Sequence, residues 1–277
     1  MPKPSSQKYC NSSCKKKSRT RSYAQTESVW GIHPVLEALK MCPQAIQEIS
    51  VARDNQGQRL KQIIEMARQN GIPVREVSGR IKAEPNNPDQ PSDHESSQVV
   101  AARIKLPALT LAELLQKLKS VAGPPLLLAL DSIQDPHNLG AIIRSAVAAG
   151  VHGIILPKDR TASITGTVIK VSAGAVYHIN ICRVTNLVTS FKELKEHGIW
   201  IFGTTKDATQ SIYDADLTVS ACLVIGGEGK GLRPLVAKQC DLHITIPMQG
   251  SLDSLNASVA AGIVLFEIVR QRRDQPG

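Results

Sequence analysis

The sequence predicts an α/β protein whose larger part is a parallel β-sheet covered by helices on both faces. From Pro124 onward, short runs that are apolar throughout alternate with helical patterns, which is typical of parallel sheets. Several of these runs end in loops rich in glycine or small polar residues, where open parallel sheets bind their ligands. A smaller unit that also alternates strand and helix precedes them.

The first segment, residues 1–26, is predicted to be a disordered basic arm. Seven Lys and Arg residues precede the first acid, Glu27, out of a net charge of +9 for the whole chain. A basic arm on a nearly neutral body indicates a polyanionic partner. A solubilising tail and an organelle transit peptide are the alternative interpretations of the same residues.

Residues 27–105 are predicted to form the small domain, and residues 106–123 a helical linker that ends at Gly123. Within the small domain we expect a helix from about Trp30 with Pro34 at its first position, and a mobile loop over 82–97, which is rich in Pro, Asn and Ser. The expected strands and the second helix are AIQEISVAR, QRLKQIIEMARQNG, IPVREVS and QVVAARIK, in chain order.

Residues 124–277 form the second predicted domain. Its expected strands and helices follow in the order LLLALD, LGAIIRSAVAAG, GIILP, a helix over 168–173, VYHINIC, a helix over 188–197, IWIFGTT, ACLVIG, LHITIP and a closing helix.

Composition excludes several classes of protein. No apolar run is long enough to span a bilayer, and no secretory signal opens the chain. We therefore expect a cytoplasmic protein that does not bind a membrane. The six cysteines are scattered, and Cys10 and Cys14 have no second Cys/His pair at a metal-binding spacing. We therefore expect reduced thiols, with Cys182 and Cys222 buried in strands, and no metal.

Two loops contain candidate functional residues. In DPHNLGAIIRSA, Asn138 is a natural N-cap, and Arg144 interrupts an otherwise apolar helix, so it needs an anionic partner, either an internal carboxylate or a phosphate. In IGGEGKGL, the glycines match neither the phosphate loop nor the dinucleotide fingerprint, and Glu228 could be a solvent-facing charge. His137 has no nucleophile and acid beside it, so a hydrolase triad is not expected.

Three stretches, NLGAIIRSA, IGGEGKGL and IPMQGSLDSLNASVA, occur in order and together resemble the three motifs of SpoU-type RNA 2′-O-ribose methyltransferases. VWGIHPVLEAL, VHGIILPKDR and FEIVRQRR resemble the bacterial branch that methylates guanosine in 23S ribosomal RNA. The resemblance covers residues 28–273. This sequence departs from the family pattern at Ser96, Ser97 and Gln98, where the family commonly has His-Gln-Gly.

The resemblance implies a trefoil-knotted C-terminal domain that binds S-adenosylmethionine, a small RNA-binding domain similar to ribosomal protein L30e, and a homodimer. It also assigns two sets of residues. Those expected at the cofactor are Thr204, Gly226, Ile246, Met248 and Leu255, and those expected in catalysis or RNA placement are Asn138, Arg144, Glu228, Ser254 and Asn256.

Such a site needs neither a covalent intermediate nor a metal, because a sulfonium methyl is already activated; it must align the ribose 2′-oxygen and help it lose a proton. A guanidinium stays protonated, so Arg144 is better as a clamp on the phosphate beside the ribose than as a base. Asn256 and Ser254 would orient the nucleophile and the substrate.

The sequence thus predicts methyl transfer to a ribose 2′-hydroxyl, with 23S ribosomal RNA or a ribosome assembly intermediate as the partner. Transfer RNA is the alternative substrate. A non-catalytic RNA-binding or ribosome-assembly protein is the alternative class. A nicotinamide-dependent oxidoreductase would rest on strand–helix alternation alone, because GxGxxG is missing.

Overall fold

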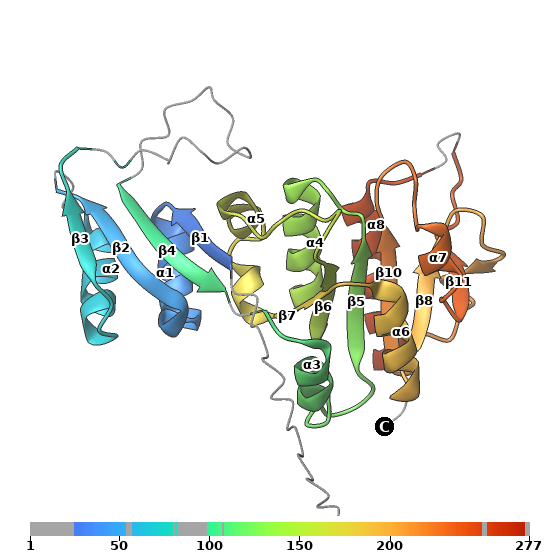
Figure 1. Cartoon of the computed structure of the whole chain (residues 1–277). Helices are drawn as coiled ribbons and strands as arrows, with labels where there is room; N and C mark the ends of the chain where they lie inside the picture. Colours follow the sequence, from blue (N-terminus) through green and yellow to red (C-terminus); the bar gives the residue numbers. More distant parts are fainter. Residues whose placement is uncertain are drawn as a thin grey trace, which may run out of the picture.

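The computed structural model describes residues 25–53, 57–79, 81, 99–106, 108–250 and 254–274, which form two units side by side (Figure 1). Most of the basic arm, the predicted loop over 82–97, the Ser96–Gln98 departure, Cys10 and Cys14 lie outside the described residues. No helix in the described part of the chain is both long and apolar enough to cross a membrane.

The small unit is a four-stranded sheet in the order β1-β4-β2-β3 with two helices. Strand β4 pairs antiparallel with β1 and β2, and β3 pairs parallel with β2. The element bounds are β1 Gln25–Trp30, α1 Ile32–Met41, a 3₁₀ turn η1 Pro43–Ala45, β2 Ile46–Ala52, α2 Gln58–Gln69, β3 Val74–Val77 and β4 Val100–Leu106.

Two predictions for the start of this unit are wrong. Residues 25–30 form strand β1, which the sequence pattern did not indicate, because Val29 is buried while Ser28 and Trp30 beside it are half-buried and Thr26 is exposed. The pairing of β1 with β4 fixes the conformation instead. Helix α1 begins at Ile32, so Pro34 is its third residue, and Gly31 precedes the helix with a φ of 100° that favours glycine.

The linker is attached to the larger sheet. Helix α3, Leu111–Leu118, begins at a capping box in which the Thr110 amide donates to Glu113 Oε2 at 2.7 Å. Leu109 adds a parallel bridge to Cys182 on the sheet edge, and Lys117 Nζ donates to Asn180 Oδ1 at 2.8 Å. The segment that joins the two units is therefore part of the framework of the larger one.

The larger unit is a seven-stranded parallel sheet in the order β7-β6-β5-β10-β8-β11-β9, which confirms the predicted α/β class. Its strands are β5 Leu126–Asp131, β6 Gly153–Pro157, β7 Asn180–Val184, β8 Trp200–Thr204, β9 Gln210–Ser211, β10 Ala221–Gly226 and β11 Leu242–Thr245. Its helices are α4 Pro136–Ala148, α5 Gly166–Val171, the 3₁₀ turn η2 Ala175–His178, α6 Leu187–Glu196, α7 Pro234–Ala237 and α8 Ala257–Arg273.

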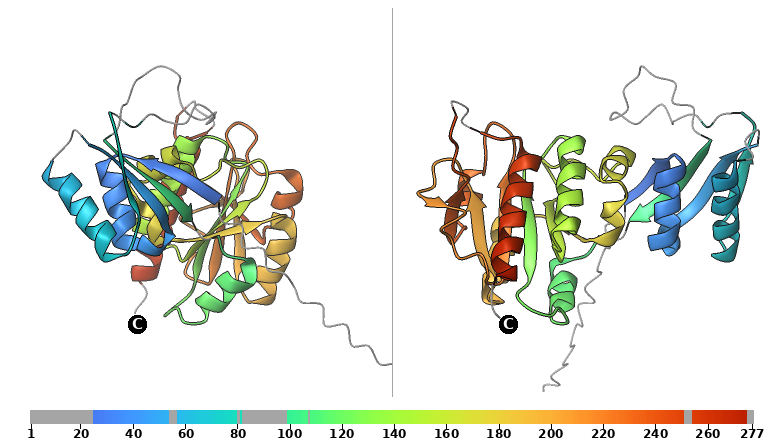
Figure 2. Two further views of the ribbon diagram at one scale, coloured as in Figure 1. Left: turned by 60° about the vertical axis from the view of Figure 1, so that its left-hand side comes forward. Right: turned by 180° about the vertical axis from the view of Figure 1, so that it is seen from behind.

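Helices cover both faces of this sheet, and the side chains of β5 alternate between them. Leu126, Leu128 and Leu130 pack with α4, α5 and α8, which lie in front of the sheet when it is seen from behind (Figure 2). Leu127 and Ala129 pack with α3, α6 and α7 on the other face. This two-sided burial explains why β5 is apolar at every position but its last. As predicted, Cys182 and Cys222 are fully buried, and burial raises the pKa of Cys182 to about 12.

The two units touch through α5 and η2. A Cβ added at Gly166 would lie 2.7 Å from the Ser28 carbonyl oxygen of β1, so the backbones approach closely there. His178 Nε2 lies 3.8 Å from Glu37 Oε1 on α1. Because α5 and η2 also pack against α4, the small unit rests against the elements that support α4.

Candidate functional site

The candidate site lies at the carboxyl edge of the large sheet, which is uppermost in Figure 1. Strands β5, β10, β8 and β11 are successive neighbours in the sheet, so the loops that follow them meet at this edge. Helix α8 begins at the same edge and ends at the opposite one (Figure 1).

The loop after β10 is shaped by its glycines. Gly229 and Gly231 have φ values of 75° and 62°, which favour glycine, and the Gly231 amide donates to the Gly227 carbonyl at 2.9 Å. A Cβ at Gly226 would lie 2.3 Å from the backbone carbon of Gly231. Only glycine fits at 226, and the loop consequently folds back over the end of its own strand.

Helix α4 begins with Asp135 as its N-cap, and Asp135 accepts a hydrogen bond from the His137 amide at 2.8 Å. The prediction that Asn138 is the cap is wrong, because the cap belongs to the residue before Pro136 and Asn138 is already in the first turn. Asn138 is 7% exposed, and its amide reaches out of the helix toward other loops.

Asn138 joins three loops through one hydrogen-bonded chain. Its Nδ2 donates to Glu228 Oε1 in the glycine-rich loop, and its Oδ1 accepts from Asn256 Nδ2 at 2.9 Å. Asn256 is also the N-cap of α8, since its Oδ1 accepts from the Ser258 amide at 2.9 Å. Glu228 is therefore more than a solvent-facing charge, because it orients a nearly buried amide.

Arg144 lies about 9 Å further along α4, at 1.5 Å per residue, and outside this chain of hydrogen bonds. It is exposed, and it forms no hydrogen bond or ion pair with any other described residue. Of the two anionic partners expected for Arg144, the internal carboxylate is therefore absent from the described part of the chain. The apolar neighbours of Arg144 face the core, while Arg144 itself faces outward. Ser254, also exposed, likewise stays apart from Asn138 and Glu228.

The residues expected at the cofactor lie at adjoining strand ends. Thr204 ends β8, and its hydroxyl donates to the Val224 carbonyl at 3.0 Å. Ile246 follows β11 and packs against the core, whereas Met248, two residues later, is 39% exposed. Leu255 is half-buried just before α8. Together with Gly226, these groups offer neutral main-chain donors and acceptors beside apolar side chains, which suits a ligand with both polar and apolar parts.

A further residue at this edge escaped the sequence interpretation. Asp131, the last residue of β5, is fully buried, and it accepts hydrogen bonds from the Arg233 amide at 2.8 Å and from Arg233 Nε at 2.6 Å. The signal was present in LLLALD, where a carboxylate closes a strand of apolar residues. Its partner lies 102 positions away, however, and no local pattern links the two.

Two family models match the chain. The model of the SpoU rRNA methylase family matches residues 125–266, and the model described as RNA 2′-O ribose methyltransferase substrate binding matches residues 28–107. The chain is 40% identical over 247 residues to the 23S rRNA (guanosine-2′-O-)-methyltransferase RlmB of Escherichia coli K12, covering 89% of this chain and 99% of that protein. It is 42% identical to RlmB of Vibrio vulnificus over 89% of this chain and 97% of that protein.

Solved structures have the same architecture. The SpoU methyltransferase AviRb of Streptomyces viridochromogenes, in complex with AdoMet, aligns with a TM-score of 0.73 and 26% identity, covering 90% of this chain and 92% of that one. The AdoMet-bound rRNA methyltransferase of Sinorhizobium meliloti aligns with a TM-score of 0.69 and 25% identity, covering 88% and 87%.

Proposed function

This chain belongs to the SpoU rRNA methylase family, and from that premise we propose that it transfers a methyl group from S-adenosylmethionine to the 2′-hydroxyl of a guanosine ribose in 23S ribosomal RNA. The observation that carries the proposal is the hydrogen-bonded chain from Glu228 through Asn138 to Asn256, which joins the ends of three loops at the edge where a parallel sheet binds its ligands.

The methyl donor would lie over the ends of β8, β10 and β11. Main-chain groups at Gly226, Ile246 and Leu255 would bind it, and the side chains of Thr204 and Met248 would flank it. S-adenosylmethionine supplies an activated methyl group on a sulfonium. The protein must therefore hold this group still and keep water away from it, which a close glycine backbone and the apolar side chain of Ile246 favour.

The RNA would approach from the outer side of α4 and α8. Arg144 is an exposed guanidinium without a protein partner among the described residues, so its donors are available for a backbone phosphate. Asn256 and Ser254 would orient the ribose hydroxyl. The proton would pass to the clamped phosphate or to solvent, because Arg144 stays protonated and acts through its charge.

Glu228 and Asn138 would act through Asn256. Glu228 accepts from the Asn138 amide nitrogen, which leaves the Asn138 oxygen to accept from Asn256. The Asn256 oxygen is in turn occupied by Ser258, so the orientation of both amides is fixed. A fixed amide chain is a suitable support for a hydroxyl that must attack in line.

We extend the proposal to the domain organisation. Residues 124–277 would form the trefoil-knotted catalytic domain, residues 27–105 the RNA-binding domain, 106–123 the linker and 1–26 an RNA-gathering arm, in a cytoplasmic protein. Support for the knot comes from α8, which packs against α4 and β10 although β11, the strand before it, lies beyond β8. The start of α8 therefore lies back toward β10, on the other side of β8 from the end of β11.

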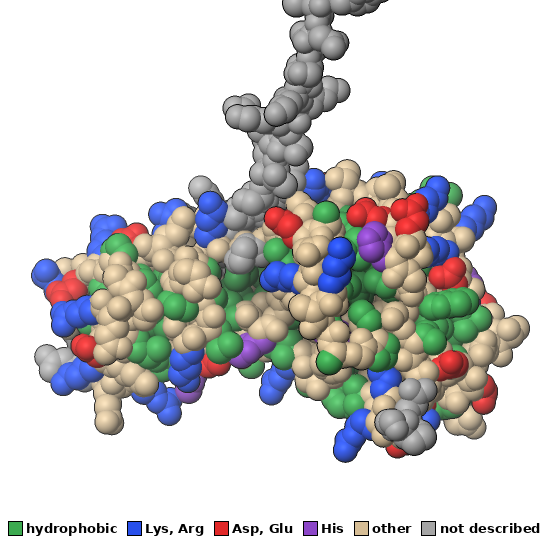
Figure 3. Space-filling model, turned by 90° about the horizontal axis from the view of Figure 1, so that it is seen from below, with side chains coloured by type: hydrophobic (Ala, Val, Ile, Leu, Met, Phe, Trp, Pro, Cys, Tyr) green, Lys and Arg blue, Asp and Glu red, His purple; other side chains and the backbone are tan. Residues whose placement is uncertain are grey.

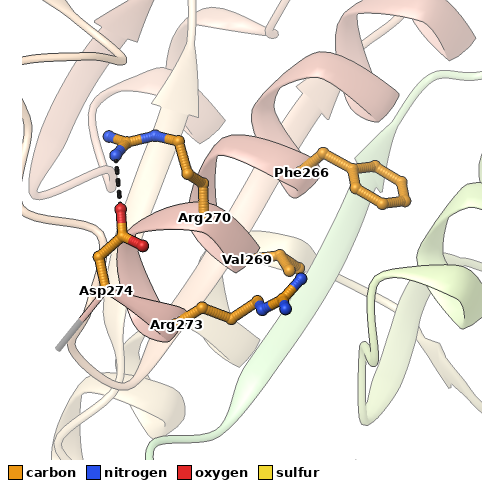
Figure 4. Close-up of a pocket in the computed structure, with 5 residues that line it drawn as sticks. All are labelled: Phe266, Val269, Arg270, Arg273 and Asp274. Carbon is orange, nitrogen blue, oxygen red and sulfur yellow. Dashed lines mark hydrogen bonds and ion pairs between the residues drawn. The ribbon is translucent and has the colours of Figure 1, made fainter. Parts of the chain in front are cut away.

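We also propose a homodimer that uses the exposed face of α8. A shallow hollow there is lined by Phe266, Val269, Arg270, Arg273 and Asp274 (Figure 4). Phe266 is 51% exposed, and Arg270 pairs with Asp274 at 2.9 Å. In a twofold contact identical patches meet, so the aromatic rings would cover each other and the cations of one copy would face the aspartate of the other.

Sedimentation velocity tests the dimer. We expect Phe266→Asp to sediment as a monomer at concentrations where the unmodified protein is a dimer. Leu235→Asp, which places the same charge on another exposed apolar residue of the large unit, should leave the dimer intact. A dimer that survives Phe266→Asp would move the interface elsewhere.

The proposed reaction is tested by transfer of labelled methyl from S-adenosylmethionine to total RNA from cells that lack this protein, followed by mapping of the labelled ribose. A single labelled guanosine in large-subunit RNA supports the proposal. Label in transfer RNA would keep the chemistry and overturn the substrate. If the protein does not bind S-adenosylmethionine and shows no methyl transfer, it would instead be a non-catalytic RNA-binding protein.

A further inference from the structure

The buried carboxylate of Asp131 has a specific partner. Among the described residues, only Asp131 and Glu267 are acidic side chains less than 9% exposed. Removing a carboxylate from water is costly unless charge and hydrogen bonds compensate it. Asp131 obtains both from Arg233, through the backbone amide at 2.8 Å and Nε at 2.6 Å, and the Ser132 hydroxyl donates more weakly at 3.4 Å.

This pair holds the glycine-rich loop at both of its ends. Gly226, where the loop begins, lies opposite Asp131 in the ladder between β10 and β5. Arg233, where the loop ends, is bonded to the same Asp131. Between them, Gly227 packs so closely on Ser132 that a Cβ would lie 2.4 Å from the Ser132 carbonyl oxygen. One residue of β5 therefore sets the distance between the two ends of the loop.

Apart from this anchor, the loop is attached to its surroundings by the Glu228 bond to Asn138 and the packing of Gly227 on Ser132, while the Gly231 bond to Gly227 lies within the loop. Gly229 and Gly231 adopt left-handed conformations that glycine can leave at low cost. The helix that follows, α7, has only four residues, and its N-cap residue, Arg233, provides no side-chain acceptor for the helix amides. Without the bond to Asp131, the main-chain groups of the loop would sample many arrangements.

We propose that Asp131 and Arg233 form a clamp that positions the main chain of the glycine-rich loop for the adenosine-bearing methyl donor. The inference rests on the function proposed above. Asp131 is a positioning residue: it is enclosed beneath the loop and acts through Arg233 and Gly226, without a contact of its own to the donor.

The chain contains a matched control at the other edge of the sheet. Asp241 Oδ2 accepts from the Ile201 amide at 2.9 Å, and Asp241 Oδ1 pairs with Lys195 Nζ at 2.6 Å. This pair has the same composition as the clamp, a carboxylate with one backbone amide and one cation, but it lies where β8 and β11 begin. Asp241 is 24% exposed whereas Asp131 is fully buried, so a variant of Asp241 reports the cost of losing such a pair at a more exposed position away from the loop.

The experiment combines hydrogen exchange of the protein without ligand, calorimetric titration with S-adenosylmethionine, and turnover at saturating donor. For Asp131→Asn and for Arg233→Met we expect the amides of residues 227–232 to exchange faster and the dissociation constant to rise roughly 10- to 100-fold. Turnover at saturating donor should fall less than the affinity, because the bond between Glu228 and Asn138 is retained in these variants. Arg233→Lys, which keeps a cation and the backbone bond, should recover most of the affinity.

Asp241→Asn should lower thermal stability but leave both the exchange of residues 227–232 and the dissociation constant unchanged. The clamp is overturned if Asp131→Asn and Arg233→Met bind as tightly as the unmodified protein, if loop exchange rises without any loss of affinity, or if Asp241→Asn loses as much affinity. Should Asp131→Asn fail to fold, Arg233→Met and Arg233→Lys alter a partly exposed side chain and carry the test alone. If the unmodified protein does not bind S-adenosylmethionine, the proposed function itself fails, whereas the exchange measurement still shows whether the clamp holds the loop.

Discussion

The two edges of the seven-stranded sheet use polar side chains in opposite ways. At the amino edge, Arg272 donates to four backbone carbonyls, those of Pro124 at 2.7 Å, Val219 at 2.6 Å, Pro125 at 3.3 Å and Leu217 at 3.4 Å. The Leu126 amide donates to His152 Nδ1 at 3.0 Å. Each of these groups satisfies backbone that would otherwise lack partners. Seen from this side, Lys and Arg are scattered among acidic and apolar side chains (Figure 3).

At the carboxyl edge, polar groups bond to one another across loops and leave their outer sides open. Asn138, Glu228 and Asn256 form such a chain, and Arg144 lies further along α4 without a partner among the described residues. We therefore propose that polar side chains at the amino edge contribute mainly to stability, and that those at the carboxyl edge take part in the proposed binding and chemistry. Substitutions at the two edges should therefore separate stability from activity.

The largest effect on activity is expected from Arg144→Ala. Loss of a phosphate clamp should lower the rate of methyl transfer roughly 10³-fold, whereas the melting temperature should change by no more than about 2 °C, because the side chain is exposed. Single-turnover transfer and thermal unfolding measure the two quantities. Lys119→Ala, which removes an exposed cation next to α3, is the control and should leave both unchanged. If Arg144→Ala transfers methyl groups at the unmodified rate, Arg144 has no role in the reaction.

The next largest effect should come from Asn256→Ser. Serine is a good N-cap, so α8 should keep its stability within about 0.5 kcal/mol, but the shorter side chain cannot reach Asn138. We expect the transfer rate to fall roughly 10²-fold through misplacement of the reacting groups. Asn186→Ser changes the same kind of cap on α6, away from the site, and should leave the rate of methyl transfer unchanged. Equal rates for the two variants would show that Asn256 is only a helix cap.

At the amino edge, Arg272→Met should lower stability without changing the chemistry. Burial lowers the pKa of Arg272, yet the group remains charged at neutral pH, and its removal leaves four carbonyls without their donor. Since part of the side chain reaches solvent, we expect a loss of about 2 kcal/mol in the free energy of unfolding. Urea denaturation measures this loss, and methyl transfer at 25 °C should stay within about twofold. A large loss of transfer in a folded variant would contradict the separation of the two edges.

The smallest effect should be a pH dependence due to His152. Burial, followed by the nearby charge of Arg272, lowers the pKa of His152 below 6.5, so the folded state favours the neutral ring. The unfolded state binds the proton more readily. The contribution of His152 to stability is therefore complete above pH 6.5 and is lost as the pH falls from 6.5 toward the lower pKa of the folded state.

Denaturant unfolding at pH 7.5 and pH 5 in the unmodified protein and in His152→Gln isolates this contribution. Glutamine can still accept from the Leu126 amide but does not titrate, so its stability should fall less on acidification. The exposed His137 provides a control, since His137→Gln should retain the full pH dependence of the unmodified protein. Identical acid sensitivity in His152→Gln would assign the dependence to other groups.

Much of the fold was predictable, because each strand carries its own signal. The continuous apolar runs of β5 and β10 indicated two-sided burial, and both strands are buried along nearly their whole length. The position of β10 between β5 and β8 was not predictable from periodicity, since pairing depends on contacts between strands that are far apart in the sequence. Strand β1 was missed for the same reason, as its pairing with β4 outweighs a weak local pattern.

The family motifs placed Asn138 and Asn256 at one site, and the two side chains do meet, while their functional roles stay predictions. The details that depend on orientation were not predictable. A helical pattern places Arg144 among apolar neighbours, but the exposure of the side chain depends on which face of α4 packs on the sheet. The role of Asp131 could not be predicted, because its partner Arg233 lies in a distant loop and no local sequence pattern links the two residues.

The central position of β10 has a consequence for synthesis of the chain on the ribosome. Strands β5, β6 and β7 emerge first, yet one edge of β5 remains unpaired until Ala221 appears, about 90 residues after Asp131. At 5 to 20 residues per second, roughly 5 to 18 seconds pass in which a strand apolar on both faces is open to other nascent chains. We expect this interval to make newly made protein a client for chaperones, and synthesis at low temperature, which weakens apolar association, should raise the soluble yield.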